Sequence, residues 1–330
     1  MINADSTLRD FFNAKQADNL AASTRDDYLI QLDHFEAYYT EAMRQEGATP
    51  RAPTLRDLSP GRVTDAVTYQ RRRGRSALTA DKVRRTVLAI WNLAADTLDD
   101  FAGPTKKIRG CRKPKLEPIA WTIEEVGKIL WAAESVTHPK AKRIGDVPFG
   151  QWLHGLIWVV YNSGLRINAI MLVRRADLSI SSRRLFVPWQ HQKDKEGQTI
   201  TLKPEAVEAI TPIVSPQRSA DLVFGGWPFD KGGRQWPALN HALKKTIVAA
   251  GLADTIGDVE KRDLWHKFRR SFATHLYKQT GDLEAVRRFM GHSSIDVTRN
   301  HYIDQSQLGQ PSQADLLPTP TRPTLRVFTG

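Results

Sequence analysis

Four side chains in the last quarter of the sequence have the right chemistry to act together on a bound anion. His266 and Arg269 stand three positions apart, which places both on one face if the segment is helical. His292 follows Gly291, and Tyr302 closes the stretch. Guanidinium groups bind phosphate oxygens, imidazoles exchange protons near neutral pH, and a phenol oxygen can act as a nucleophile. Each residue alone is equally well explained as a polar helix face or, for the tyrosine, a core aromatic.

Two further candidates precede this group. Arg166 lies in the stretch Asn162-Ser163-Gly164-Leu165-Arg166-Ile167. Lys193 lies in a polar turn between two segments with strand character, 185–187 and 199–202, and Lys195 is the alternative in the same turn. An arginine after Gly-Leu, or a lysine in a polar hairpin, is usually a surface residue. The occurrence of all these segments in this order is more informative than any one of the residues.

That order resembles the tyrosine recombinases, also called phage integrases. The family has a Gly-Leu-Arg box, a lysine between two strands, an H-x-x-R box, a Leu-Gly-His motif (here Met290-Gly291-His292) and then the nucleophilic tyrosine. The resemblance covers residues 121–302. By this resemblance the catalytic residues are Arg166, Lys193, His266, Arg269, His292 and Tyr302.

The resemblance also implies a role for each residue. Tyr302 would attack a DNA phosphate, giving a 3′-phosphotyrosine and a free 5′-hydroxyl, so that ligation is the same reaction in reverse. The two arginines would neutralise the phosphoryl oxygens. Lys193 would protonate the leaving oxygen, His266 would take the tyrosine proton or hold the phosphate, and His292 would donate to a non-bridging oxygen. Neither a metal nor a cofactor is expected.

Two positions depart from the family pattern. The family often has an acidic residue three positions after the first arginine, where this chain has Ala169. The support that such a residue gives the second arginine is therefore in question. His301 stands where some members, with a spacing one residue shorter, have the tyrosine; Tyr302 is kept as the nucleophile.

A metal site is the rival explanation for the histidines. His266, His275, His292 and His301 would supply imidazoles, but no H-E-x-x-H pattern accompanies them, and Arg269 would repel a cation. We therefore predict no metal site.

The elements that must position these residues are mostly helical. Ser23-Thr24-Arg25-Asp26 and Thr79 are expected to begin helices, and Thr122 is expected to cap another. Phe268, Phe272 and Phe289 are expected in the core. The only segment with convincing strand character is 178–202. Further apolar periodicity predicts helices at 152–160, 236–250 and 264–278.

Two basic segments favour a nucleic-acid partner. Lys+Arg number 48 against 36 Asp+Glu, a net charge of +12. The cations cluster in two places, and the candidate DNA-binding residues are Arg71, Arg72, Arg73, Arg75, Lys106, Lys107 and Arg109. The second cluster lies in a proline-containing stretch that reads as a flexible linker. The sequence has one cysteine, Cys111, and it has neither a long apolar run nor a secretory signal. These features favour a cytoplasmic, nucleoid-associated protein without membrane spans.

The sequence thus predicts a mainly α fold with a small antiparallel sheet, arranged as a two-domain C-shaped clamp. The domains are a helical core-binding domain at 1–103, a basic linker at 104–120, a catalytic domain at 121–304 and an extended tail at 305–330. The expected function is site-specific recombination of double-stranded DNA by a homotetramer, integrating or excising a mobile element or phage. Accessory DNA-bending or directionality proteins are compatible partners. The alternatives are a type IB topoisomerase-like enzyme and a catalytically silent DNA-binding protein.

Overall fold

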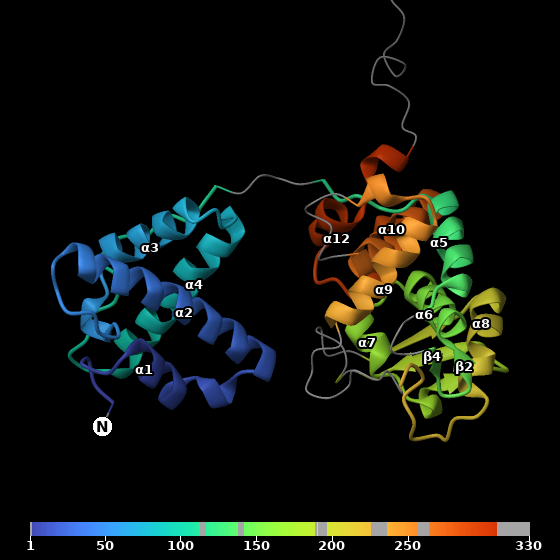
Figure 1. Cartoon of the computed structure of the whole chain (residues 1–330), viewed down its shortest axis with the longest axis horizontal. Coiled ribbons are helices and arrows are strands. Elements are labelled where there is room, and N and C mark those ends of the chain that lie inside the picture. Colours follow the sequence, from blue (N-terminus) through green and yellow to red (C-terminus); the bar gives the residue numbers. More distant parts are fainter. Residues whose placement is uncertain are drawn as a thin grey trace, which may run out of the picture. The chain divides into compact units, whose positions relative to one another are not determined.

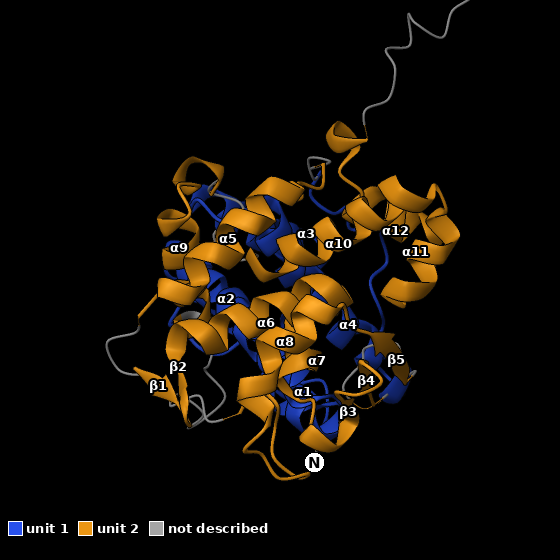
Figure 2. Cartoon of the chain, turned by 90° about the vertical axis from the view of Figure 1, so that its right-hand side faces the viewer, with its two compact units in different colours: residues 1–115 blue, residues 116–330 orange. Residues whose placement is uncertain are grey.

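The computed structural model describes residues 2–112, 117–137, 142–188, 190, 197–225, 236–256 and 264–308. The chain divides into two compact units, Met1–Lys115 and Leu116–Gly330 (Figure 2). The division falls inside the segment that the sequence assigned to the linker.

The first unit is built from helices. They are α1 (Leu8–Lys15), α2 (Ala22–Gln45), α3 (Pro60–Arg72) and α4 (Ala77–Thr97) (Figure 1). The helices bury one apolar face each, as amphipathic helices of globular proteins do. Val83, Val87 and Ile90 recur at helical spacing along α4 and share a core with Phe11 of α1 and Phe35 of α2.

Two predicted helix starts in this unit are wrong. α4 is capped by Ser76, whose hydroxyl accepts from the Thr79 backbone N–H at 3.1 Å, so the cap lies three residues before the predicted one. Serine and threonine at this spacing are both good caps, and only the extended backbone of Ser76 decides between them. α2 begins after Ala21, which places the predicted capping box at 23–26 within the helix.

The first part of the predicted linker is packed rather than flexible. Ile108 is buried in the core of the first unit. Its carbonyl accepts from the Arg84 guanidinium of α4 at 3.0 Å, and the Ala102 carbonyl accepts from the Trp91 indole at 2.9 Å. One apolar side chain among many cations therefore anchors this stretch, and Lys106, Lys107 and Arg109 project from it, exposed.

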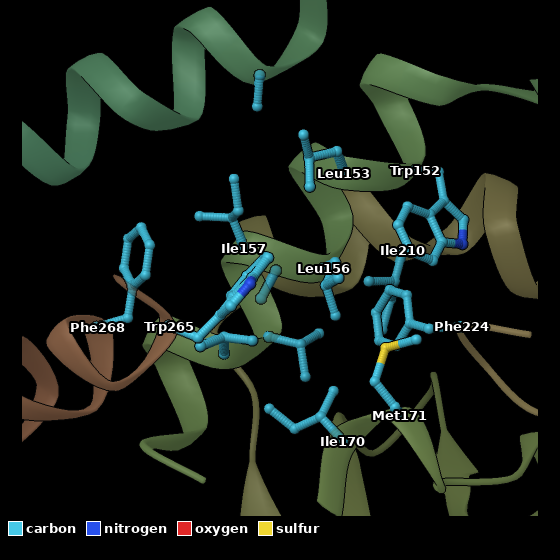
Figure 3. Close-up of a cluster of buried hydrophobic side chains, with 14 of the residues drawn as sticks. Trp152, Leu153, Leu156, Ile157, Ile170, Met171, Ile210, Phe224, Trp265 and Phe268 are labelled. Carbon is cyan, nitrogen blue, oxygen red and sulfur yellow. The ribbon is translucent and has the colours of Figure 1, made fainter. Parts of the chain in front are cut away.

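The second unit is also mainly helical. Its helices are α5 (Ile123–Ser135), α6 (Phe149–Ser163), α7 (Ile167–Met171), α8 (Pro204–Val214), α9 (Trp236–Ala249), α10 (Leu264–Thr280), α11 (Leu283–Met290) and α12 (Ile295–Tyr302). α5 starts with the predicted Thr122, which forms a reciprocal capping box with Glu125. α6 is apolar around most of its surface and lies in the middle, with α5, α8 and α10 against it. Figure 3 shows Trp152, Leu156 and Ile157 of α6 in this core.

Two small antiparallel sheets complete the unit. β3 (Leu178–Ser179), β4 (Arg184–Val187) and β5 (Gln198–Thr201) form the predicted sheet, in which Leu185 pairs with Ile200 on the buried side. A hairpin of β1 (Arg143–Ile144) and β2 (Val147–Pro148) was not predicted. The predicted class, mainly α with a small antiparallel sheet, is confirmed. No helix in the part of the chain that the structure describes is long and apolar enough to cross a membrane.

A separate apolar cluster fixes the last helices onto α10. Its buried members are Ala273, Leu283, Val286, Met290, Tyr302 and Ile303. The segment beyond α12 is hydrogen-bonded to the segment before α5. Asp304 accepts from the Ala120 backbone N–H at 2.9 Å, and Gln307 donates to the Ala120 carbonyl. Residues 305–307, assigned from sequence to the extended tail, form a 3₁₀ turn here. Residues 309–330 of that tail lie outside the described residues.

Candidate active site

Arg269 lies at the centre of the predicted site and is almost fully buried, with 1% of its surface exposed. It projects from α10 and donates to the Gly164 carbonyl at 2.5 Å and the Met290 carbonyl at 2.6 Å. The same guanidinium also lies 3.0 Å from Nε2 of His292. A buried cation needs such partners, because burial without them costs several kcal/mol.

Two helix ends supply this support. Gly164 ends α6 and Gly291 ends α11, both in the left-handed conformation with φ of 62°. The last carbonyls of a helix carry partial negative charge and have no partner within the helix. These carbonyls face the Arg269 guanidinium, whereas Ala169 is buried and offers no charge. The helix ends thus give the Arg269 guanidinium two backbone acceptors.

Gly164 is required for a second reason besides its backbone conformation. A Cβ atom at this position would come within 2.2 Å of the Phe272 ring on α10. The close approach of α6 to α10 brings the Gly164 carbonyl to Arg269. A side chain at residue 164 would move that carbonyl away.

His292 and Tyr302 pack beside the guanidinium. His292 is 5% exposed, and its Nδ1 lies 3.0 Å from the Thr298 hydroxyl. Tyr302, at the end of α12, is 7% exposed, and its ring centroid lies 4.3 Å from that of His292 and 5.0 Å from that of His266. The carbon of the Arg269 guanidinium lies 5.3 Å from the Tyr302 ring. The H-x-x-R box, the Gly-His motif and the tyrosine therefore meet in one site.

The backbone of Tyr302 is held through α10. Its carbonyl accepts from the buried Thr274 hydroxyl at 3.2 Å, and the same hydroxyl accepts from the Asp304 N–H at 3.0 Å. This places the end of α12 against the helix that carries His266 and Arg269.

The other predicted residues have different outcomes. Arg166, half-buried, directly precedes α7, and its positive charge helps to lower the pKa of both His266 and His292, so it faces the same centre. Lys193 and Lys195 lie outside the described residues. The strands that flank them are β4 and β5, and β5 is joined to α11 because the Gln198 amide donates to the Phe289 carbonyl at 2.8 Å.

Both site histidines are neutral at physiological pH. Burial, and then the positive charges of Arg270, Arg269 and Arg166, lower the pKa of His266 to about 3. Burial, and then chiefly the charges of Arg269 and Arg166, lower the pKa of His292 to about 3 as well. A neutral imidazole has a lone pair, so both rings can accept a proton.

These low values predict acid sensitivity. The pKa of each histidine is lower in the folded protein than in the unfolded chain, where it is about 6.5. Its contribution to the free energy of unfolding is therefore complete above pH 6.5 and is lost as the pH falls toward about 3. Each adds a slope of up to about 1.4 kcal/mol per pH unit to the free energy of unfolding. We expect the H266Q/H292Q double variant to lose stability less steeply than the wild type in urea titrations below pH ~6.5. Parallel slopes for the double variant and the wild type would contradict the assignment.

Four residues near the site were assigned from sequence, three phenylalanines to the core and His301 to a flanking position. Phe268 is buried, and Phe272 is partly buried against the cluster that holds Tyr302. Phe289 is 52% exposed, so its predicted core position is wrong: it lies on the outer side of α11, while Val286 and Met290 take the inner side. His301 is exposed on α12, turned away from the buried site.

Sequence reasoning missed the Thr298 hydroxyl and the carbonyls of Gly164 and Met290. The two glycines were visible as helix-end signals. That both helix ends meet at one guanidinium depends on contacts over 105 and 21 positions of the chain, which spacing does not reveal.

In the first unit, the predicted basic patch surrounds the end of α3. Arg71 donates to the Arg75 carbonyl at 2.6 Å, and Arg73 donates to the Tyr69 hydroxyl at 2.9 Å, so these two side chains hold the turn. Gly74 takes a φ of 77° in this turn. All four arginines of the patch are exposed, as are Lys106, Lys107 and Arg109. Within the described residues, no group of three or more His, Cys, Asp or Glu side chains is arranged to hold a metal ion.

The comparison with protein families defines the class. Residues 124–308 match the model of the phage integrase family, whose members are the tyrosine recombinases. The match spans more than half of the chain and includes Arg166, Arg269 and Tyr302. The chain therefore belongs to the phage integrase family and is a tyrosine-type site-specific recombinase.

Individual relatives extend over both units. The chain is 25% identical over 311 residues to tyrosine recombinase XerD of Chlorobaculum tepidum, covering 91% of this chain and 92% of that one. It is 26% identical over 307 residues to tyrosine recombinase XerC of Xanthomonas axonopodis pv. citri, covering 89% and 90%.

Solved structures of recombinases share the fold. A XerH recombinase bound to a palindromic difH substrate in a post-cleavage complex has a TM-score of 0.65 at 18% identity, covering 88% of this chain and 79% of that one. A lambda integrase tetramer bound to a Holliday junction has a TM-score of 0.59 at 17% identity, covering 89% and 78%. At such identities the likeness establishes the fold alone.

Proposed function

We propose that this chain cuts and rejoins double-stranded DNA through a covalent 3′-phosphotyrosine on Tyr302, and thereby integrates or excises a mobile element or phage. The observation that carries the proposal is the packing of the Tyr302 ring against His266, His292 and Arg269. A tyrosine that served only as core would not need two neutral histidines and a buried cation around its ring.

The proposed reaction conserves the energy of the phosphodiester bond. The Tyr302 oxygen forms a bond to phosphorus and loses its proton to His266, while the bond from phosphorus to the 5′-oxygen breaks and that oxygen takes a proton from Lys193 or Lys195. Arg166 and Arg269 neutralise the charge that grows on the non-bridging oxygens. Attack of a 5′-hydroxyl from a second duplex then reverses the step and exchanges the strand.

The first unit is proposed to be the core-binding domain, and the basic segments to contact phosphates. Arg72 and Arg75 are the best probes, since Arg71 and Arg73 hold the turn and their removal would disturb it. Each phosphate contact contributes about 0.9 to the slope of log affinity against log salt. We expect the R72A/R75A double variant to bind duplex DNA with a slope smaller by up to about 2.

Binding measured by fluorescence anisotropy at several salt concentrations would test this assignment. The exposed Arg218 of the second unit, paired with Asp221, provides a matched control that should keep the wild-type slope. An unchanged slope in R72A/R75A would remove these residues from the DNA interface.

The functional assembly is proposed to be a homotetramer on two duplexes, working in the cytoplasm at the nucleoid, with accessory DNA-bending or directionality proteins as further partners. Exchange of strands between two duplexes requires two cutting subunits on each. The lambda integrase tetramer on a Holliday junction, which shares this fold, supports the arrangement.

A strand-exchange assay separates this function from the two alternatives. Plasmids that carry the DNA flanking the gene would be incubated with the protein, beside supercoiled plasmids that lack it. Recombination of the first set alone is expected. Relaxation of both sets would favour a type IB topoisomerase-like enzyme, and specific binding without any cut would favour a silent DNA-binding protein.

A further inference from the structure

The hydrogen bonds around His292 have only one consistent direction. The Arg269 guanidinium carries donors alone, so Nε2 of His292, 3.0 Å away, must accept. A neutral imidazole has one N–H and one lone pair. Its proton must therefore be on Nδ1, which then donates to the Thr298 hydroxyl oxygen at 3.0 Å.

Thr298 is placed to accept this hydrogen bond within the protein interior. The residue is fully buried, with 0% of its surface exposed, and lies on α12 one helical turn before Tyr302. The Ser294 carbonyl, at 3.5 Å within the same helix, provides an acceptor for the Thr298 hydroxyl hydrogen. The bonds run in one direction, from Arg269 through His292 and Thr298 to Ser294.

We infer that Thr298 is a positioning residue that, together with the Arg269 donor, holds His292 in the Nδ1–H tautomer, with the Nε2 lone pair directed toward the Arg269 guanidinium at the reaction centre. An unconstrained histidine side chain in water prefers the other tautomer, with its proton on Nε2. The orientation matters because the nitrogen that lacks a proton is the one that gains it when an anion enters the site.

The effect on DNA cleavage rests on the proposed function. When a DNA phosphate enters and accepts the Arg269 N–H in place of Nε2, the freed Nε2 of His292 can take one proton from solvent and donate it in a hydrogen bond to a phosphoryl oxygen. Thr298 accepts from Nδ1–H both before and after this step, so the ring does not have to turn. The charged or titratable side chains around His292, among the described residues, are Arg269 and His266 of α10, Arg287 of α11, Tyr302 of α12, and Arg166.

The tautomer can be measured directly in the full-length protein. Long-range ¹H–¹⁵N correlation spectra of ¹⁵N-histidine-labelled protein distinguish the two ring nitrogens, and loss of the signals in His292→Gln assigns them. We expect a protonated Nδ1 and a bare Nε2 in the wild type and in Thr298→Ser. Thr298→Val, which keeps the shape, leaves Nδ1–H without an acceptor while Arg269 still donates to Nε2, and should lower the fraction of protein that shows this signature. A wild-type His292 with its proton on Nε2 would overturn the inference, whether or not the variants fold.

Cleavage provides the second readout. Covalent adduct formation by Thr298→Val on nicked duplexes should slow by about 10- to 100-fold, the range typical when the partner that orients a functional histidine is lost. Thr298→Ser should remain within a few-fold of wild type. Thr246→Val, which removes an equally buried hydroxyl on α9, is the matched control and should cleave normally.

These results keep the two proposals apart. An absence of adduct in the wild type would contradict the proposed function, while the tautomer of the free protein would still decide the role of Thr298. Equal loss of cleavage in the serine and valine variants, with the tautomer unchanged, would assign Thr298 to packing alone.

Discussion

Arg269→Ala should abolish DNA cleavage and lower the free energy of unfolding by about 3–5 kcal/mol. Removal of the guanidinium leaves the buried carbonyls of Gly164 and Met290 and the His292 ring without their donor. Each buried acceptor that loses its partner costs about 1–3 kcal/mol. Arg269 would thus have two roles: it would take part in DNA cleavage, and it would hold α6, α10 and α11 together.

Arg269→Lys separates these two requirements. Lysine keeps the charge, but its single ammonium cannot present the planar set of donors that reaches two carbonyls and an imidazole at once. We expect cleavage to fall by about 10²- to 10³-fold, the cost of one misplaced donor to a transition state, with a smaller loss of stability than in the alanine variant.

Adduct formation and urea unfolding would be measured for both variants, with Arg218→Ala as the exposed control. The control should differ from wild type by less than about 1 kcal/mol and cleave normally. Wild-type cleavage by Arg269→Ala would show that the site does not use this cation.

Tyr302→Phe is the other substitution with a large expected effect. It deletes one oxygen from a ring that packs between His266 and His292, so the fold and DNA binding should be retained. Adduct formation should nevertheless fall below detection, because the nucleophilic oxygen is gone.

Tyr277→Phe is the matched control, since Tyr277 packs against the same cluster from α10 and stands nearest in sequence among the other tyrosines. It should form the adduct at the wild-type rate. Survival of the adduct in Tyr302→Phe together with its loss in Tyr277→Phe would reassign the nucleophile.

The sequence predicted which side chains meet in the candidate site better than it predicted what supports them. The spacing of His266 and Arg269 placed these two on one helix face, and the resemblance of the ordered motifs to the tyrosine recombinases predicted that Tyr302 joins them. The source of support for Arg269 could not be predicted. Backbone carbonyls have no sequence signature, and Ala169, where the family often has an acidic residue, indicated a missing partner rather than the two carbonyls that accept from Arg269.

Local structure was likewise predictable only where the partner residue is close in sequence. The cap at Thr122 was predictable because its partner Glu125 is three residues away. The cap of α4 was not, because Ser76 and Thr79 satisfy the same rule and the preceding turn decides between them. The cations around Ile108 predicted a flexible linker. Its burial could not be predicted, because it depends on contacts with α4, which is distant in sequence.

The central claim is that Tyr302 becomes covalently joined to DNA. The most direct measurement is to trap the protein on nicked duplexes built from the DNA flanking its gene, digest the adduct with protease and identify the modified peptide by mass spectrometry. We expect the 3′-phosphate of the cut strand on Tyr302, and a free 5′-hydroxyl on the other end. Attachment at another residue, or specific binding with no adduct at all, would contradict it.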